Sequence, residues 1–386
     1  MTVTPKKLLF AISDTGGGHR SAAMAISAAI AARAGSGIDC RTIDFLRATK
    51  LPGLSKAPEI YDYCSKEHVW LNNLLFRKTN TPSRITTLTN IVYHQSHRHI
   101  ENELSIAQPD AVIAVHPLVI GLLAAARQKL QASWPIIAVV TDLITIHAAW
   151  ASPGADLYLV PTPEAARLLT KYKIPPQRIF QAGFPVHPKF LQNKLSKVQA
   201  RQKLGLHPDC FTIMLTGGGV GAGSMEEWVQ MLQNRCAGKQ LLVITGNNKK
   251  LYQTLHQRQA TPLLHLYGFV QNMELMMAAS DLIITKAGPG TILEGIAMSR
   301  PLIITGAIGI QETGNIDYVR RHRFGYYCPT PAQACKTINE IDAGLDLNSL
   351  NPALPNTTIV DGSAMIADII LQQVGWTYAH LLGGAS

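Results

Sequence analysis

The first candidate functional residues lie in a glycine-rich turn near the start of the chain. The run Asp-Thr-Gly-Gly-Gly-His-Arg-Ser fills residues 14–21, directly after a short apolar segment. The glycines, Gly17 and Gly18 among them, let the backbone approach a ligand closely, and a helix that starts near His19 offers free N–H groups. Histidine can take a proton near neutral pH, so the turn predicts a general base, with a plain polar helix cap as the alternative.

A second turn of this kind lies in the other half of the chain. Residues 285–294 read Thr-Lys-Ala-Gly-Pro-Gly-Thr-Ile-Leu-Glu, which predicts the end of a strand, a tight turn and a helix starting near Gly290. The free N–H groups of that helix would suit diphosphate oxygens. Glu294 lies one turn into the helix, where a carboxylate can accept hydrogen bonds from a ribose diol. The alternative is a glutamate that only caps the helix.

A third group of polar residues follows the next predicted strand. Gln311, Glu312 and Asn315 stand within five positions of one another and supply both hydrogen-bond donors and acceptors. A sugar needs both for its hydroxyls. Alone, this group does not identify a sugar site.

Short apolar runs, each followed by a glycine-rich or polar turn, predict the elements that position these residues. Such runs are typical of parallel strands covered on both faces. The pattern restarts in the second half of the chain, where a Gly-Gly-Gly-Val-Gly-Ala-Gly turn fills residues 217–223. We therefore expect an α/β protein with two doubly wound, Rossmann-like domains facing across a cleft. The predicted strands are residues 7–13, 111–115, 136–141, 157–160, 211–215, 240–245, 281–285 and 301–305, with helices over 19–34 and from 225.

Four segments make up the expected domain organisation. Residues 1–190 form the first Rossmann-like domain, and residues 191–205 form a linker rich in polar residues. Residues 206–362 form the second Rossmann-like domain. Residues 363–386 form a C-terminal helix that packs back on the first domain.

Charge is unevenly spread along the chain. The net charge is +10, and residues 1–190 hold 20 Lys and Arg against 12 Asp and Glu. Residues 47–100 hold eight Lys and Arg, three Asp and Glu, and several aromatic residues. This composition indicates an amphipathic surface for an anionic membrane, with an ordinary helical cover of the sheet as the alternative. No nucleic-acid-binding motif is present, so we expect no nucleic-acid partner.

Composition also bears on the compartment. The six cysteines include no Cys-x-x-Cys pair, which favours a reducing cytosol over a disulfide or zinc framework. The longest nearly apolar stretch, residues 111–126, is interrupted by His116 and Pro117 and is short for a bilayer span. We expect a cytoplasmic protein that associates with the membrane peripherally. The sequence does not indicate an oligomeric state.

Six motifs together carry a family resemblance that covers most of residues 7–325. In chain order they are D-T-G-G-G-H-R-S-A, V-H-P-L, T-D-L-x-T-x-H-x-x-W, G-F-V-x-N-M, K-A-G-P-G-T-I-x-E and Q-E-x-G-N. The set resembles the monogalactosyldiacylglycerol synthase and processive diacylglycerol glucosyltransferase family of GT-B glycosyltransferases. It is similar, more weakly, to the N-acetylglucosaminyltransferase of peptidoglycan lipid synthesis.

The resemblance implies an inverting transfer of galactose or glucose from a UDP-sugar to the hydroxyl of 1,2-diacylglycerol. It implies no cofactor, and no Asp-x-Asp motif argues for a bound metal. The alternatives are a UDP-N-acetylglucosamine-dependent transferase acting on a polyprenyl-linked lipid and a non-catalytic nucleotide-sugar-binding protein.

The resemblance also assigns roles. His19 would be the base, with Asp142 as the next candidate. The acceptor would lie near Gly17, Gly18, His116 and His147. The donor would lie among Gly218, Gly219, Phe269, Val270, Gly288, Gly290, Thr291, Glu294, Gln311, Glu312 and Asn315, with the uracil on Phe269 and Val270, the ribose on Glu294 and the hexose on the last three.

Overall fold

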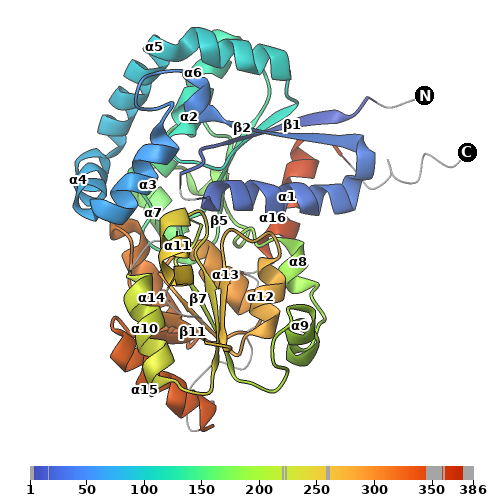
Figure 1. The fold of residues 1–386 in the computed structure, drawn as a ribbon. Helices are drawn as coiled ribbons and strands as arrows, with labels where there is room; N and C mark the ends of the chain where they lie inside the picture. Colours follow the sequence, from blue (N-terminus) through green and yellow to red (C-terminus); the bar gives the residue numbers. More distant parts are fainter. Residues whose placement is uncertain are drawn as a thin grey trace, which may run out of the picture. The chain divides into compact units, whose positions relative to one another are not determined.

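The computed structural model describes residues 4–15, 17–219, 221, 224–257, 261–344, 359 and 361–376 (Figure 1). The chain forms two compact units. The first unit comprises Met1–Cys64, Trp70–Pro188 and Thr358–Ser386, and the second comprises Ser65–Val69 and Lys189–Thr357.

The first unit is built on a six-stranded sheet in which every neighbouring pair is parallel. The strand order is β2-β1-β3-β4-β5-β6, so the chain direction across the sheet reverses between β1 and β3. The strands are β1 (Lys6–Ile12), β2 (Ile38–Asp44), β3 (Ala111–Ala114), β4 (Ile136–Val139), β5 (Leu157–Val160) and β6 (Ile179–Gln181).

Helices cover both faces of this sheet. Alternate residues of a strand point to opposite faces, so Leu8 and Phe10 of β1 pack on one side and Leu9 on the other. The helices of this part of the chain are α1 (Gly18–Ala34), α2 (Phe45–Ala48), α3 (Ala57–Glu67), α4 (Val69–Thr79), α5 (Pro82–Ala107), α6 (Val119–Lys129) and α7 (Pro163–Lys171), with 3₁₀ turns η1 (Gly35–Gly37), η2 (Ala148–Ala151) and η3 (Pro176–Arg178).

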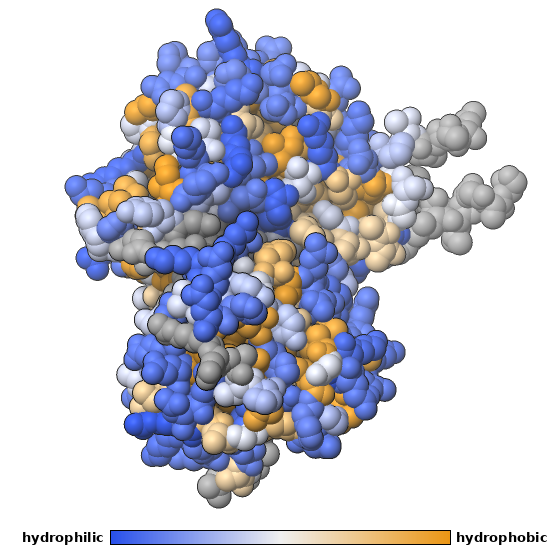
Figure 2. Space-filling model, viewed as in Figure 1, coloured by the Kyte–Doolittle hydropathy of each residue, from blue (hydrophilic) through white to orange (hydrophobic). Residues whose placement is uncertain are grey.

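The basic, aromatic segment over residues 47–100 is helical. Ile100 and Leu104 of α5 are buried in the core beside β1 and β3, as a cover of the sheet requires. Trp70, Leu74 and Leu75 of α4 are instead exposed, at 64%, 41% and 53%. In Figure 2 the surface over α4, at the left of the view, mixes apolar and hydrophilic side chains. The membrane-facing role of this segment stays a prediction.

The second unit repeats the plan. Its sheet is also six-stranded and parallel throughout, in the order β12-β11-β10-β7-β8-β9, with the reversal between β10 and β7. The strands are β7 (Thr212–Thr216), β8 (Gln240–Ile244), β9 (Leu264–Tyr267), β10 (Leu282–Thr285), β11 (Leu302–Ile304) and β12 (Gly325–Tyr327). The helices are α8 (Pro188–Leu191), α9 (Lys197–Lys203), α10 (Met225–Arg235), α11 (Lys249–Gln257), α12 (Met273–Ala279), α13 (Pro289–Ala297), α14 (Ile310–Arg321) and α15 (Pro331–Asp342).

Residues 191–205 are part of the second unit and contain α9, which corrects the expectation of a linker. Ser196 caps α9 in a reciprocal capping box with Gln199. Arg201 is 5% exposed, donates to the carbonyl of Ala279 and pairs with the carboxylate of Asp281. A buried, fully engaged arginine holds this segment on the sheet.

The C-terminal helix α16 (Gly362–Gln373) packs on α1 in the first unit. Ile366 and Ile370 lie in the same apolar cluster as Ile26 and Ile30 of α1. Gly362 lies against the backbone of Gly183 and Phe184, where a Cβ atom would come within 2.4 Å of the chain. The last part of the predicted helix, residues 377–386, lies outside the described residues. No helix in the described part of the chain is long and apolar enough to cross a membrane.

Candidate active site

Gly17 and Gly18 of the first glycine turn lie at the switch point of the first sheet. They follow β1, and His116 follows β3, the neighbouring strand across the reversal. Thr141 and Asp142 follow β4, the next strand. Ligands of open α/β sheets bind at this position, outside the carboxyl ends of the strands.

His19 is packed among side chains from all three strand ends. Its Nδ1 lies 3.2 Å from the hydroxyl of Thr141, and its ring meets the edge of His116 with centroids 4.7 Å apart. The Trp150 ring lies 6.4 Å away. Gly17 caps α1 with a φ of 78°, a left-handed conformation that favours glycine. The turn thereby starts α1 at Gly18 and places His19 in its first turn.

Burial keeps both histidines neutral. It lowers the pKa of His19 to about 4, against opposing effects of a hydrogen bond to the Val115 carbonyl and the Asp14 charge. Burial, and then the neighbouring His19, lowers the pKa of His116 well below its usual value. A neutral imidazole has one nitrogen lone pair, which a general base needs, although the lowered pKa makes His19 a weaker base than an exposed histidine.

Asp142 and His147 line the same end of the sheet. One carboxylate oxygen of Asp142 accepts the indole N–H of the buried Trp150 at 2.8 Å. His147 caps η2, where its Nδ1 accepts the Ala149 N–H at 3.1 Å. Its Nε2 lies 3.1 Å from the hydroxyl of Thr79.

Two glycine turns lie at the switch point of the second sheet. Gly218 and Gly219 follow β7, and residues 286–288 follow β10, its neighbour across the reversal. Gly218 has a φ of 74°, and a Cβ atom there would lie 3.2 Å from the Lys286 side chain. Gly288 caps α13, so the free N–H groups of that helix begin at this turn. Backbone N–H groups and a cation therefore gather where a phosphate could bind.

Glu312 and Asn315 of α14 hold this turn in place. The Glu312 carboxylate is 5% exposed, pairs with the Lys286 ammonium at 2.5 Å and accepts the Ile308 N–H at 2.8 Å. The Asn315 amide donates to the Ala287 carbonyl at 2.8 Å, while its own oxygen has no hydrogen-bond partner among the described residues. In the free protein, both side chains order the Lys286 turn, and Asn315 retains an unused acceptor.

Glu294 lies in the first turns of α13 and is strongly desolvated. Burial raises its pKa to about 8, with Lys189 opposing and Glu274 reinforcing the shift. The raised pKa favours the protonated carboxyl group near neutral pH, and a ligand or a cation that stabilises the ionised form would oppose this shift.

Comparison with known proteins identifies the family. The model of the Monogalactosyldiacylglycerol (MGDG) synthase family matches residues 19–186, and that of the Glycosyltransferase family 28 C-terminal domain matches residues 212–306. Monogalactosyldiacylglycerol synthase 2 of Arabidopsis thaliana is 32% identical, over 87% of this chain and 73% of its own length. The chain belongs to the monogalactosyldiacylglycerol synthase family.

Other members of this synthase family are longer than the chain. The chloroplastic synthase of Spinacia oleracea is 33% identical, over 87% of this chain and 66% of its own length. For synthase 1 of Arabidopsis thaliana the identity is 32% and the covered share of the relative is 64%. The chain thus spans about two thirds of the length of these two synthases.

Solved structures place this synthase-family chain in the GT-B fold. The structure of Acinetobacter baumannii MurG aligns with a TM-score of 0.54 at 14% identity, covering 95% of this chain and all of MurG (100%). The co-structure of S. aureus MnaA with UDP aligns with a TM-score of 0.61 at 14% identity, covering 96% of this chain and 98% of the other. At such identities the likeness shows the fold alone, and it confirms the expected pair of Rossmann-like domains.

The structure gathers the predicted site residues of this synthase-family chain into two groups. His19, His116, Asp142 and His147 lie at one end of the first sheet, and Gly218, Gly219, Gly288, Glu312 and Asn315 at one end of the second. Phe269 and Val270 follow β9, where Phe269 is 64% exposed, and Gly290, Thr291 and Gln311 are partly exposed near the starts of α13 and α14. Their roles remain predictions.

Three residues that the sequence analysis did not select contact the predicted site. Lys286 pairs with Glu312, Thr141 contacts His19, and Trp150 donates to Asp142. All three lie inside motifs that carry the family resemblance, which was the available signal.

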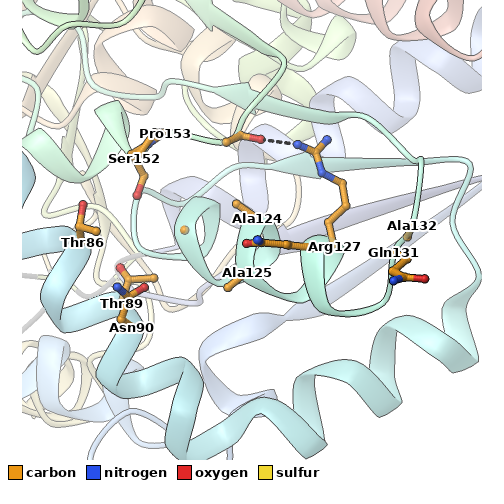
Figure 3. A pocket seen from close by; sticks show the side chains of 13 residues that line it. Thr86, Thr89, Asn90, Ala124, Ala125, Arg127, Gln131, Ala132, Ser152 and Pro153 are labelled. Atoms are coloured by element: carbon orange, nitrogen blue, oxygen red, sulfur yellow. Dashed lines mark hydrogen bonds between the residues drawn. The ribbon is translucent and has the colours of Figure 1, made fainter.

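A cavity of about 560 Å³ lies elsewhere in the first unit, beside α5 and α6 (Figure 3). Its lining includes Thr89, Ala124 and Ser152, and Arg127 donates across it to the Gly154 carbonyl at 2.9 Å. None of the predicted site residues lines this cavity. It therefore adds nothing to the reaction considered below.

Proposed function

We propose that this chain transfers galactose from UDP-galactose to the free hydroxyl of 1,2-diacylglycerol, forming a β-monogalactosyldiacylglycerol. Its family membership supports galactose as the sugar and diacylglycerol as the acceptor. The observation that carries the proposal is His19, a neutral imidazole at the switch point of the first sheet.

The reaction would be a single displacement. His19 takes the proton of the acceptor hydroxyl as its oxygen bonds to C1 of the sugar. The bond between C1 and the diphosphate oxygen breaks, and its electron pair leaves with UDP. Attack opposite the leaving group inverts C1, so an α-linked donor gives a β-glycoside.

The second unit would bind the donor and stabilise the leaving diphosphate. Gly218, Gly288 and the start of α13 would place N–H groups and a helix dipole on the phosphates. Lys286, held by Glu312, would add a positive charge there. Glu294 would bind the ribose diol, and Gln311, Glu312 and Asn315 the hexose.

The acceptor would be taken from a membrane surface. Exposed Trp70, Leu74 and Leu75 of α4 would enter the interface, and the basic surface of residues 1–190 would attract anionic lipid. We therefore infer a peripheral membrane location on the cytoplasmic side.

Product analysis tests the function directly. Purified protein is incubated with mixed micelles of 1,2-dioleoylglycerol and either UDP-galactose or UDP-glucose, and the glycolipid is identified by mass spectrometry and proton NMR. We expect a galactolipid whose anomeric coupling shows a β-linkage. A glucolipid in its place would reassign the donor.

Two further outcomes would overturn the proposal. Transfer of N-acetylglucosamine to a polyprenyl-linked acceptor, with none to diacylglycerol, would favour the peptidoglycan-type reaction. UDP-sugar binding without transfer to either lipid would indicate a non-catalytic binding protein.

A further inference from the structure

A set of hydrogen bonds joins the end of α4 to the turn η2. The Thr79 hydroxyl donates to the Leu75 carbonyl at 2.7 Å and lies 3.1 Å from Nε2 of His147. The Phe76 ring meets the His147 ring edge to face, with centroids 4.8 Å apart. Just beyond α4, Asn80 accepts the Ala148 N–H at 2.7 Å.

The hydrogen bonds fix the tautomer of His147. The backbone N–H of Ala149 donates to Nδ1, which must therefore carry a lone pair. The imidazole proton then lies on Nε2, facing α4, where the Thr79 oxygen and the Phe76 carbonyl can accept it. Burial lowers the pKa of His147, in agreement with a neutral ring. Both nitrogens are thus used within the protein.

The turn that His147 caps leads directly into the predicted catalytic end of the sheet. η2 contains Trp150, which is fully buried and donates to Asp142. The Trp150 ring lies 6.4 Å from that of His19. The other end of the connection is α4, whose Trp70, Leu74 and Leu75 are exposed.

We propose that His147 is a positioning residue that clasps the lipid-facing helix α4 to the turn carrying Trp150, and so holds the acceptor side of the site in register with the base. It does not contact the reacting atoms. The inference rests on the proposed function, in which α4 meets the membrane and His19 activates the acceptor. It reassigns His147, which the resemblance places among the residues that line the acceptor.

Paired substitutions test the clasp. Thr79→Val removes the hydroxyl with little change of shape, and Thr79→Ser restores it. His147→Asn keeps an acceptor near the Ala149 N–H but cannot reach Thr79. Loss of one net hydrogen bond predicts a rise of about 3- to 10-fold in KM for dioleoylglycerol. The kcat and the KM for UDP-galactose should stay within about twofold.

A double variant and two control variants show whether Thr79 and His147 act through one shared hydrogen bond. If both residues serve one bond, the double variant should be no worse than the more affected single variant, and Thr79→Ser should restore the wild-type KM. Thr87→Val removes an equivalent hydroxyl-to-carbonyl bond at an exposed position of α5, and His99→Asn changes an exposed histidine. Neither control should change the acceptor KM.

Hydrogen exchange provides a readout that does not depend on turnover. In Thr79→Val and His147→Asn, the amides at the end of α4 and in η2 should exchange faster than in the wild type and in Thr87→Val. Unchanged exchange and unchanged acceptor KM would overturn the clasp, as would an equal rise in KM for both substrates. Wild-type protein that makes no glycolipid, with faster exchange in the variants, would overturn the proposed function alone.

Discussion

Burial shifts the pKa values of two titratable residues of the site in opposite directions. Burial disfavours a charge of either sign, so it lowers the pKa of His19 to about 4 and raises that of Glu294 to about 8. Burial therefore favours the uncharged form of both groups near neutral pH. A neutral histidine is ready to accept a proton, whereas a protonated glutamate must release one before it can bind a diol as a carboxylate.

For His19, the base role predicts a large loss of turnover on substitution. His19→Ala should lower kcat by about 100- to 10,000-fold, the usual contribution of general-base catalysis. UDP affinity should be nearly unchanged, because the donor residues lie in the second unit. Because the free base titrates near pH 4, wild-type kcat/KM should stay level from pH 7 to about pH 5 with respect to this group.

Measuring kcat, UDP affinity and melting temperature on the same His19→Ala protein separates a catalytic role of His19 from a structural one. Gly17 is the cap of α1, so a purely structural His19 would only stabilise the first turn of this helix, and its loss would lower stability but spare turnover. Near-normal kcat with a lower melting temperature would therefore remove His19 from the mechanism. Asp142 would then be the next base to test.

Glu294 predicts that UDP binding is linked to proton release. Binding of the diol to the ionised carboxylate would lower the pKa, so affinity should rise with pH until about pH 8 and then level off. Glu294→Gln should weaken binding by about 1.5–3 kcal/mol at pH 9, the range for hydrogen bonds to a charged group, and by less at pH 6.5.

Titration calorimetry at both pH values checks this linkage. The difference between wild type and Glu294→Gln cancels the titration of UDP itself. Glu340→Gln on α15, where the glutamate side chain is 40% exposed, is the matched control and should behave as the wild type. Equal UDP affinities of Glu294→Gln and wild type at pH 9 would show that Glu294 does not bind the ribose and is only a structural residue of α13.

At the level of helices and strands, the predicted site residues of each unit lie at two strand ends. These two ends are neighbours in the sheet but distant in the chain. β1 pairs with β3 across residues 13–110, and β7 pairs with β10 across residues 217–281. The glycine turns lie where these neighbours diverge, which opens room outside the strand ends. The helices that connect these strands in the chain do not all serve to cover the sheet. One of them, α4, exposes apolar side chains.

The exposed side chains of α4 predict a loss of lipid binding on substitution. Leu74→Ser with Leu75→Ser should lower the partition to phosphatidylcholine–phosphatidylglycerol vesicles by about tenfold or more, because burial of one leucine contributes about 1.5–3 kcal/mol. Vesicle sedimentation measures the change. Ile106→Ser, on α5 and also exposed, should leave the partition as it is in the wild type.

At the scale of the whole molecule, the charge distribution predicts a salt-sensitive attraction to anionic lipid. The first 190 residues hold 20 Lys and Arg against 12 Asp and Glu, while residues 191–386 hold 15 against 13. Binding to phosphatidylglycerol-containing vesicles should weaken between 50 mM and 500 mM NaCl, because added salt shortens the Debye length from about 14 Å to about 4 Å. Pure phosphatidylcholine vesicles should bind less and respond less to salt. Equal binding to both at every salt concentration would exclude electrostatic docking.

The amino-acid sequence predicted eight of the twelve strands in the described part of the chain, two Rossmann-like domains and three glycine turns. The four strands it did not predict, β2, β6, β9 and β12, are the edges of the two sheets. Central parallel strands are buried on both faces and read as apolar runs. Edge strands are largely half-buried or exposed here, so their residues carry a weaker pattern.

The contacts of the polar residues of the site follow from the tertiary structure. His19 meets Thr141 across 122 positions, and Lys286 meets Glu312 across 26. The directions of the pKa shifts of His19 and Glu294 follow from burial by such distant neighbours. Local sequence determines where a strand ends and a helix can begin, because those are short-range effects. The desolvation of a charge and the use of a hydrogen-bond donor depend on which remote strand ends pair. This pairing is a long-range property of the folded chain.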